Sequence, residues 1–137
     1  MLRITQKVIS GKKRGRKIGF PTLNFPLEKN EKIKRGVWVV KLKSGKKEYF
    51  GIANVGSAKT FNEKEEKIEV HVFSPLKNEI KKAKIYFLKY LRKTKKFKKV
   101  ENLKKQIKKD IKEALSFLDS FKKSLTKIGL DKKRQNK

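Results

Sequence analysis

The sequence predicts a mainly β protein, a small antiparallel barrel closed on one side by a C-terminal amphipathic α-helix. Short β-branched and aromatic runs, separated by glycine, proline and polar residues, fill the chain to about residue 91. Beyond residue 100 the apolar residues recur at three- and four-residue steps, which is the period of a helix. The length of 137 residues is that of one domain.

Short segments carry the strand pattern between loops of polar residues. They are residues 4–9, 20–25, 37–42, 47–55, 67–73 and 82–91. A turn at residues 44–46 predicts a hairpin between the third and fourth segments. Gly51 and Gly56 interrupt the fourth segment, which indicates a bulge or a close approach by another backbone or a ligand.

The helix is expected from about residue 101 to about residue 127, with lysines on its outer face. Its apolar stripe is Leu103, Ile107, Ile111, Ala114, Leu115, Leu118, Phe121 and Leu125. Residues 129–137 form a charged tail that we expect to be frayed, so the folded domain is predicted to span residues 1–128.

Composition excludes several classes of protein. The formal net charge is +28, which attracts polyanions, but lysines occur in every segment and favour solubility over one nucleic-acid-binding face. The absence of cysteine excludes disulfides and thiolate zinc sites, and a single histidine excludes a multi-histidine metal site. No apolar run approaches the ~18 residues of a membrane span, and the N-terminus lacks a signal-peptide core. We therefore expect a soluble, cytoplasmic protein.

The most informative stretch runs from residue 11 to residue 24. Three glycines and five cations precede Pro-Thr-x-Asn, and backbone N–H groups near glycine form concavities that bind anions. The hydroxyl of Thr22 suits Mg²⁺, and in an extended segment the Asn24 amide points to the same side. The alternative interpretation is a solvated basic loop followed by a turn.

The strand at residues 67–73 alternates between two faces. Ile68, Val70 and Val72 lie on one face, and Glu69 and His71 lie on the other. Glu69 is either a surface residue or a carboxylate held near the basic loop, where positive charge would keep it ionised. For His71 we expect a packing or hydrogen-bonding role.

Residues 11–24 resemble the opening motif of the riboflavin kinase (flavokinase) family, a basic Arg-Gly-Arg-like segment followed by Gly-Phe-Pro-Thr-x-Asn. Further blocks of this family follow in order over about residues 6–118. They are Gly36-Val37-Trp38, Gly51-Ile52-Ala53-Asn54-Val55-Gly56, Thr60-Phe61, Ile68-Glu69-Val70-His71-Val72-Phe73, Leu91-Arg92 with Phe97, and Leu103-x-x-Gln106-Ile107-x-x-Asp110. The resemblance implies a six-stranded, antiparallel Greek-key barrel with a C-terminal helix.

The resemblance also implies an activity, transfer of the terminal phosphate of ATP to the 5′-hydroxyl of riboflavin, giving FMN and ADP with Mg²⁺ or a similar divalent cation. Glu69 falls on the family's general base. The nucleotide-binding positions are Gly11, Arg16, Gly19, Thr22 and Asn24, and Thr22 and Asn24 are also the metal-binding positions. The flavin-binding positions are Arg92, Lys95 and Phe97, although Arg92 could instead form a surface salt bridge and Phe97 could anchor the helix.

The sequence departs from the family pattern at three places. Residues 78–81 replace an Asp-x-Tyr-Gly turn, Lys59 replaces a proline, and Lys99 replaces the serine that usually caps the helix. We expect no adenylyltransferase activity from these residues, so the reaction is expected to stop at FMN unless a separate protein makes FAD.

Two other functions stay open, a basic nucleic-acid-binding barrel and a non-catalytic flavin-binding relative. The first needs aromatic residues interleaved with cations on one strand face, whereas Leu88 separates Tyr86 from Tyr90. The nucleic-acid-binding alternative also leaves Glu69 unexplained. For the kinase we expect small-molecule substrates, no specific nucleic acid, no membrane and a monomer.

Overall fold

The computed structural model describes residues 2–9, 20–28, 32–57 and 64–127. The predicted tail at residues 129–137 and most of the glycine-rich basic loop lie outside this part of the chain. Six strands and one helix make up the fold: β1 (Leu2–Lys7), β2 (Thr22–Pro26), β3 (Gly36–Ser44), β4 (Lys47–Gly56), β5 (Lys67–Val72), β6 (Lys82–Arg92) and α1 (Val100–Lys127).

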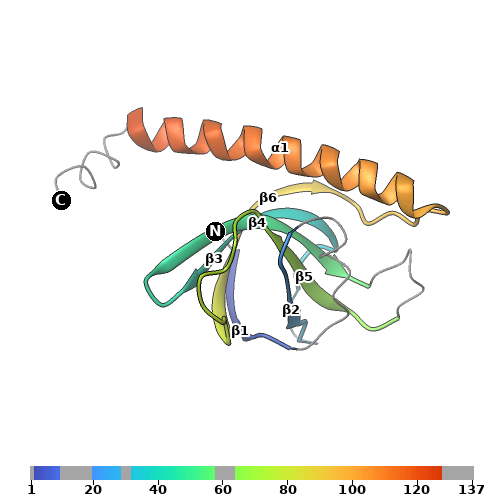
Figure 1. The fold of residues 1–137 in the computed structure, drawn as a ribbon, viewed down its shortest axis with the longest axis horizontal. Coiled ribbons are helices and arrows are strands. Elements are labelled where there is room, and N and C mark those ends of the chain that lie inside the picture. The colour runs from blue at the N-terminus through green and yellow to red at the C-terminus, as the bar shows by residue number, and fades with distance from the viewer. Residues whose placement is uncertain (1, 10–19, 29–31, 58–63, 128–137) are drawn as a thin grey trace.

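The strands form one antiparallel sheet in the order β1-β6-β3-β4-β5-β2. Strands β3, β4 and β5 are neighbours in sequence and in space, and β6 returns to lie beside β3, which is the Greek-key arrangement. The sheet curls into a half-barrel below α1 (Figure 1). Its two edges meet after β1, where the Ile9 N–H donates to the Asn24 carbonyl oxygen at 2.8 Å. The predicted mainly β class, strand number and C-terminal helix are confirmed.

Strand β1 ends earlier than its sequence pattern predicts. It covers Leu2–Lys7, not residues 4–9. The Val8 N–H donates to the carbonyl oxygen of Lys81, just before β6, and Ile9 then bridges to β2. The chain thus leaves one edge of the sheet for the other at residue 8, and β-branched composition alone does not reveal this change of partner.

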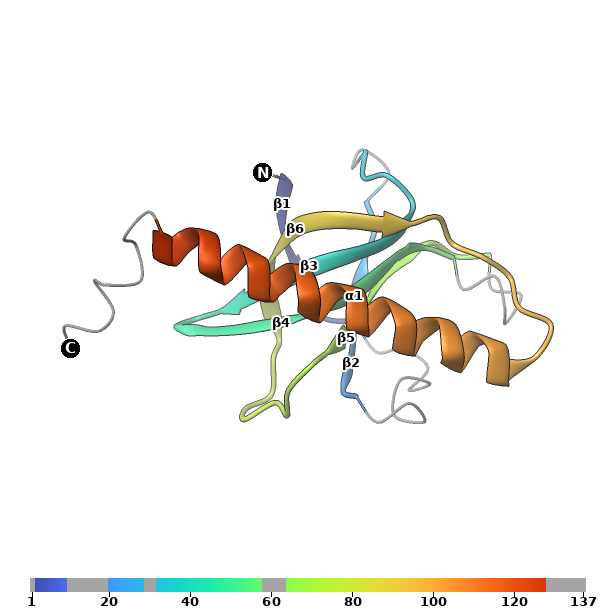
Figure 2. The same ribbon diagram turned by 90° about the horizontal axis from the view of Figure 1, so that it is seen from above.

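Two apolar clusters stabilise the two faces of the sheet. Inside the curl, the largest fully buried side chains include Phe25, Leu42, Ile68 and Ile85. On the outer face, a second cluster joins strands to helix: Val37, Val39, Ile52, Ile107, Ala114 and Leu118. Seen from above, α1 crosses the sheet obliquely (Figure 2). Most of the predicted stripe therefore packs on the outside of the barrel, but Leu115 is 51% exposed, so its inclusion in the stripe was wrong. The inner face of the sheet packs around its own core.

Gly51 allows β4 and β5 to approach closely. A Cβ atom at this position would collide with the backbone carbonyl oxygen of His71. Of the two interpretations for this glycine, close approach by another backbone is the one that the structure shows. His71 and Glu69 lie on the same strand, so the close approach at Gly51 also positions the part of β5 that carries Glu69.

Lys99 is the N-cap of α1. Its carbonyl oxygen accepts the N–H groups of Asn102 at 3.1 Å and Leu103 at 3.3 Å. A lysine side chain offers no acceptor for the free N–H groups of the first turn, and its charge opposes the helix dipole. Lys99→Ser is therefore expected to raise the free energy of unfolding by about 0.5–1 kcal/mol in urea titrations. Lys98→Ser, one residue before the N-cap, is the control, and equal stability of the two variants would contradict the prediction.

Candidate active site

Strand register brings the three functional candidates on β2 and β5 together. Thr22 lies opposite His71, and Asn24 lies opposite Glu69. Their neighbours on β2 and β5 point into the inner core, so these four side chains share the outer face, where α1 packs. Cross-strand neighbours lie about 5 Å apart at Cβ. A carboxylate, an amide, a hydroxyl and an imidazole thus form one polar group of side chains, which we call the β2–β5 cluster.

His71 lies between two members of the β2–β5 cluster. Its Nδ1 is 3.4 Å from the Thr22 Oγ1, and its Nε2 is 3.9 Å from the Glu69 Oε1. The residue is only 7% exposed. Burial lowers the pKa of His71 from 6.5 to about 4, because the charged imidazolium is poorly solvated there. The ring is therefore neutral at pH 7, with one N–H and one lone pair.

The lowered pKa of His71 predicts a loss of stability in acid. An unfolded chain binds a proton at this ring below pH 6.5, whereas the folded chain does so only near pH 4. Stability is thus fully present above pH 6.5 and falls as pH drops, by about 2.5 kcal/mol at pH 4.5. Urea unfolding at pH 7 and pH 4.5 measures this fall. His71→Gln should show a smaller fall, and an equal fall in both proteins would contradict the prediction.

Asn24 carries a buried acceptor without a protein partner. The side chain is 4% exposed, and its Oδ1 is the one buried side-chain nitrogen or oxygen atom in the described residues that lacks a hydrogen bond. A buried amide oxygen left without a partner costs free energy, so such an atom suggests a missing ligand. Carbonyl and hydroxyl oxygens are the ligands that Mg²⁺ prefers, and the Thr22 hydroxyl lies two residues away on the same face. The donor set fits a hard cation that keeps further ligands from phosphate or water.

The register also places Asn54 of β4 opposite Glu69, on the other side from Asn24. The Oδ1 of Asn54 accepts a hydrogen bond from the Thr94 hydroxyl at 3.1 Å. Thr94 belongs to the segment that links β6 to α1. This bond therefore ties the connecting segment to the strand beside Glu69.

Arg92 ends β6 and is held by α1. Its Nε and Nη2 donate to the two carboxylate oxygens of Asp110 at 2.9 and 2.7 Å, and its Nη1 donates to the carbonyl oxygen of Lys93 at 3.0 Å. Gln106 donates to the same carboxylate at 3.0 Å. Asp110 is 2% exposed, and the Arg92 side chain is 22% exposed. The ion pair named as an alternative for Arg92 is thus present, and it is partly buried.

The other expected flavin-binding residues lie further along the connecting segment. The Lys95 ammonium is 5.5 Å from the ring centroid of Phe97, which is half-buried. The nucleotide-binding candidates Gly11, Arg16 and Gly19 lie outside the described residues, as does Lys59. The altered turn at residues 78–81 is described, and Ile80 within it is buried in the inner core.

Our sequence interpretation gave no role to Asn54, Thr94 or Asp110. Asn54 lies on the same face of β4 as the buried residue Ile52, so it is a polar residue in an otherwise apolar row. Asp110 follows Ile107 on the stripe that packs on the sheet, where an acidic residue needs a buried partner. At both positions a polar residue interrupts an apolar row, and this could have been noticed in the sequence. Nothing in the sequence pattern marks Thr94.

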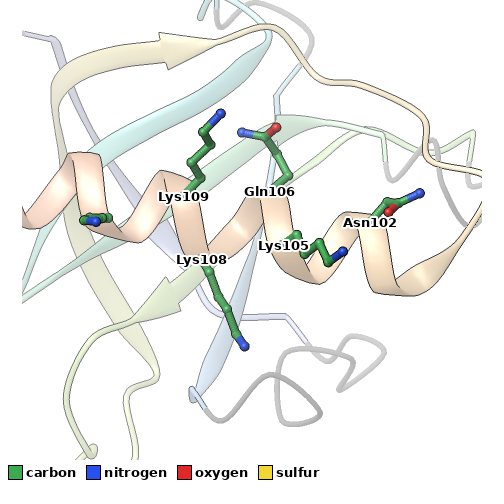
Figure 3. A pocket seen from close by; sticks show the side chains of 6 residues that line it. Asn102, Lys105, Gln106, Lys108 and Lys109 are labelled. Atoms are coloured by element: carbon green, nitrogen blue, oxygen red, sulfur yellow. The ribbon is translucent and has the colours of Figure 1, made fainter.

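A separate hollow lies along α1. It is lined by Asn102, Lys105, Gln106, Lys108, Lys109 and Lys112 (Figure 3). The lysines are exposed, and Lys108 and Lys109 extend from opposite sides of the helix. The hollow is a basic surface of one helix and contributes no group to the β2–β5 cluster.

The fold and the β2–β5 cluster define a Greek-key β-barrel domain with hydroxyl, amide and carboxylate groups gathered on one strand face. The chain belongs to the riboflavin kinase family. The family model described as "Flavokinase: Riboflavin kinase" matches residues 1–118. The resemblance noted in the sequence is therefore confirmed.

In the curated relatives, the region similar to this chain is one part of a longer protein. The bifunctional riboflavin kinase/FMN adenylyltransferase of Haemophilus influenzae is 38% identical over 120 residues, which cover 86% of this chain and 39% of the relative. That of Bacillus subtilis is 38% identical over 122 residues, covering 85% and 38%. The trifunctional protein RibF/MnmA of Mycoplasmoides gallisepticum is 38% identical over 127 residues, covering 90% and 19%. The chain thus spans about two fifths or less of the length of these relatives.

A solved structure shares the fold. A crystal structure from Streptococcus pneumoniae, described as a macrolide-efflux protein, matches with a TM-score of 0.68 and 32% identity. The match covers 81% of this chain and 37% of that one. Among the described residues of the present chain, none forms a helix with the length and hydropathy that a membrane span requires.

Proposed function

We propose that this chain is a riboflavin kinase domain that transfers the terminal phosphate of ATP to the 5′-hydroxyl of riboflavin, giving FMN and ADP. The observation that carries the proposal is the register of β2 and β5, which sets Glu69 opposite Asn24 and two residue pairs from the Thr22–His71 pair, on the same face. Membership of the riboflavin kinase family selects this phosphoryl transfer among the reactions that such a cluster could support.

Phosphoryl transfer depends mainly on positioning and on stabilising charge. Glu69 is the proposed general base, which accepts the proton of the 5′-hydroxyl as its oxygen attacks phosphorus. Thr22 and Asn24 would hold Mg²⁺, which when bound neutralises charge on the phosphates. The basic loop, with Gly11, Gly19 and the Arg16 guanidinium, is proposed to hold the phosphate oxygens.

The flavin is proposed to lie along the segment that joins β6 to α1. Arg92, Lys95 and Phe97 come from this segment or the end of β6, and guanidinium groups and phenyl rings stack on flat aromatic molecules. The Thr94–Asn54 hydrogen bond holds the same segment against the strand next to Glu69. For the proposed transfer, the 5′-hydroxyl of a flavin bound there has to reach the β2–β5 cluster. All named residues come from one chain, so a monomer would suffice.

The proposal is tested by incubating the purified chain with riboflavin, ATP and Mg²⁺ and separating flavins by chromatography. FMN that forms in proportion to enzyme and time is the expected result. Flavin binding without turnover would favour a non-catalytic relative. Neither turnover nor flavin binding, with tight and salt-dependent binding of RNA or DNA, would favour the basic barrel.

Thr22→Ala is expected to raise the KM for Mg²⁺–ATP about tenfold, since a bond to a charged group is lost. Steady-state kinetics at saturating riboflavin measure this change. Thr22→Ser keeps the hydroxyl and is the matched control, expected within about threefold of wild type. If Thr22→Ala has the KM of Thr22→Ser, the threonine oxygen is not a ligand.

A further inference from the structure

His71 occupies a position that the proposed reaction does not yet explain. Its ring faces the proposed metal ligand Thr22 with Nδ1 at 3.4 Å and the proposed base Glu69 with Nε2 at 3.9 Å. The side chain comes from β5, and its backbone is held by the close approach of Gly51. Nδ1 is thus at the outer limit of hydrogen-bonding distance from the Thr22 hydroxyl, and Nε2 lies near the Glu69 carboxylate at more than a direct hydrogen-bond length.

The chemistry of the Thr22 hydroxyl selects one tautomer of this ring. When the oxygen of a hydroxyl binds a cation, its lone pairs point to the cation and its proton must go to another acceptor. The atom facing the Thr22 hydroxyl is Nδ1, so with a cation on the Thr22 oxygen Nδ1 would be the acceptor and Nε2 would carry the hydrogen. That hydrogen lies on the side of the Glu69 carboxylate.

We propose that His71 is a positioning residue for phosphoryl transfer, which holds Thr22 through Nδ1 and orients the Glu69 carboxylate through Nε2–H. The inference rests on the proposed function and deepens it. One ring then sets the direction of both the metal ligand and the base. Mutation of a residue that orients a metal ligand or a base commonly changes affinity or rate by ~10–100-fold, so the expected effect is measurable.

A purely packing residue at this position would not need two polar atoms. The position directly opposite on β4 is Ile52, an apolar residue that joins the cluster beneath α1. An apolar side chain at residue 71 would extend that cluster without the desolvation that burying an imidazole costs. The polar ring therefore fits the two groups that it faces better than it fits the packing.

Two substitutions separate the two ring nitrogens. An asparagine at residue 71 places a polar atom near the Nδ1 position, and a glutamine places one near the Nε2 position. His71→Asn is expected to keep the affinity for Mg²⁺–ADP within about threefold of wild type and to lower kcat about tenfold. His71→Gln is expected to weaken Mg²⁺–ADP binding, measured by calorimetry, about tenfold and to lower kcat less.

Val70→Ala is the control for a loss of stability alone. Val70 lies on the same strand but is fully buried in the inner core, so its truncation destabilises the fold without touching the β2–β5 cluster. Activity per folded molecule should equal that of wild type for Val70→Ala and fall for His71→Asn. The inference is overturned if both His71 variants behave like Val70→Ala.

The design also distinguishes this inference from the proposed function. A wild-type protein that makes no FMN overturns the proposed function. The Mg²⁺–ADP affinities measured by calorimetry then test the role of His71 separately. Equal affinity of wild type and His71→Gln for Mg²⁺–ADP would overturn the inference. A wild-type protein that makes FMN, with His71 variants of unchanged kcat and affinity, leaves the kinase in place and removes His71 from it.

Discussion

Glu69→Gln is expected to lower kcat for FMN formation at least ~10²-fold, the lower end of the effect of removing a general base. Glutamine has nearly the same shape as glutamate but cannot accept the proton of the 5′-hydroxyl. The cluster geometry should persist, since Glu69 is flanked in register by the amides of Asn24 and Asn54. The affinity for riboflavin is therefore expected to stay within about threefold of wild type.

Glu48→Gln is the matched control, the same substitution on β4 at an exposed residue that pairs with Lys41 at 3.3 Å. It should leave kcat within about twofold of wild type. Both variants are compared by circular dichroism and urea unfolding, so that a fold defect is not mistaken for a catalytic one. A Glu69→Gln enzyme with the wild-type rate would remove Glu69 from its proposed role, whatever the stability of the variant.

Asp110→Asn is expected to lower the free energy of unfolding by about 3 kcal/mol. The Asp110 carboxylate is buried and accepts both parallel hydrogen bonds from Arg92. Removing one partner of a buried ion pair leaves the other charge uncompensated, which costs ~3–5 kcal/mol. The low end applies here because the Arg92 side chain keeps partial access to water. Urea unfolding measures the change.

Asp119→Asn provides the control on the same helix. Asp119 is exposed and pairs with Lys123 at 3.2 Å in an i,i+4 arrangement. Such exposed pairs contribute about 0.3–0.5 kcal/mol, so this variant should be almost as stable as wild type. If the two aspartate variants lose the same stability, the Arg92–Asp110 pair does not anchor α1 to β6 as its geometry indicates.

The local periods of the sequence predicted most of the secondary structure. The alternation over residues 67–73 separated Glu69 and His71 from the aliphatic row, and the structure confirms that Ile68, Val70 and Val72 are buried inside the curl. The apolar stripe beyond residue 100 predicted α1 nearly to the residue. Local pattern was enough here because side-chain parity on a strand and period on a helix follow from backbone geometry alone.

The motif in residues 11–24 also carried information without a structure. The spacing of Thr22 and Asn24 put both side chains on one face of an extended segment, and β2 has that form. The resemblance to riboflavin kinases supplied Glu69 as the third member. What neither pattern nor resemblance supplied was the partner strand, because pairing between residues 24 and 69 is not local.

The sequence by itself determined the number and approximate bounds of the strands, the helix, most of the faces of their side chains and the family. Only the tertiary structure decided that β2 pairs with β5, that His71 lies between Thr22 and Glu69, and that Asp110 holds Arg92. The physical reason is that strand register is set by side chains packing from many strands at once. A buried ion pair likewise joins residues from two elements, so the sequence pattern of one element does not identify the partner residue in the other.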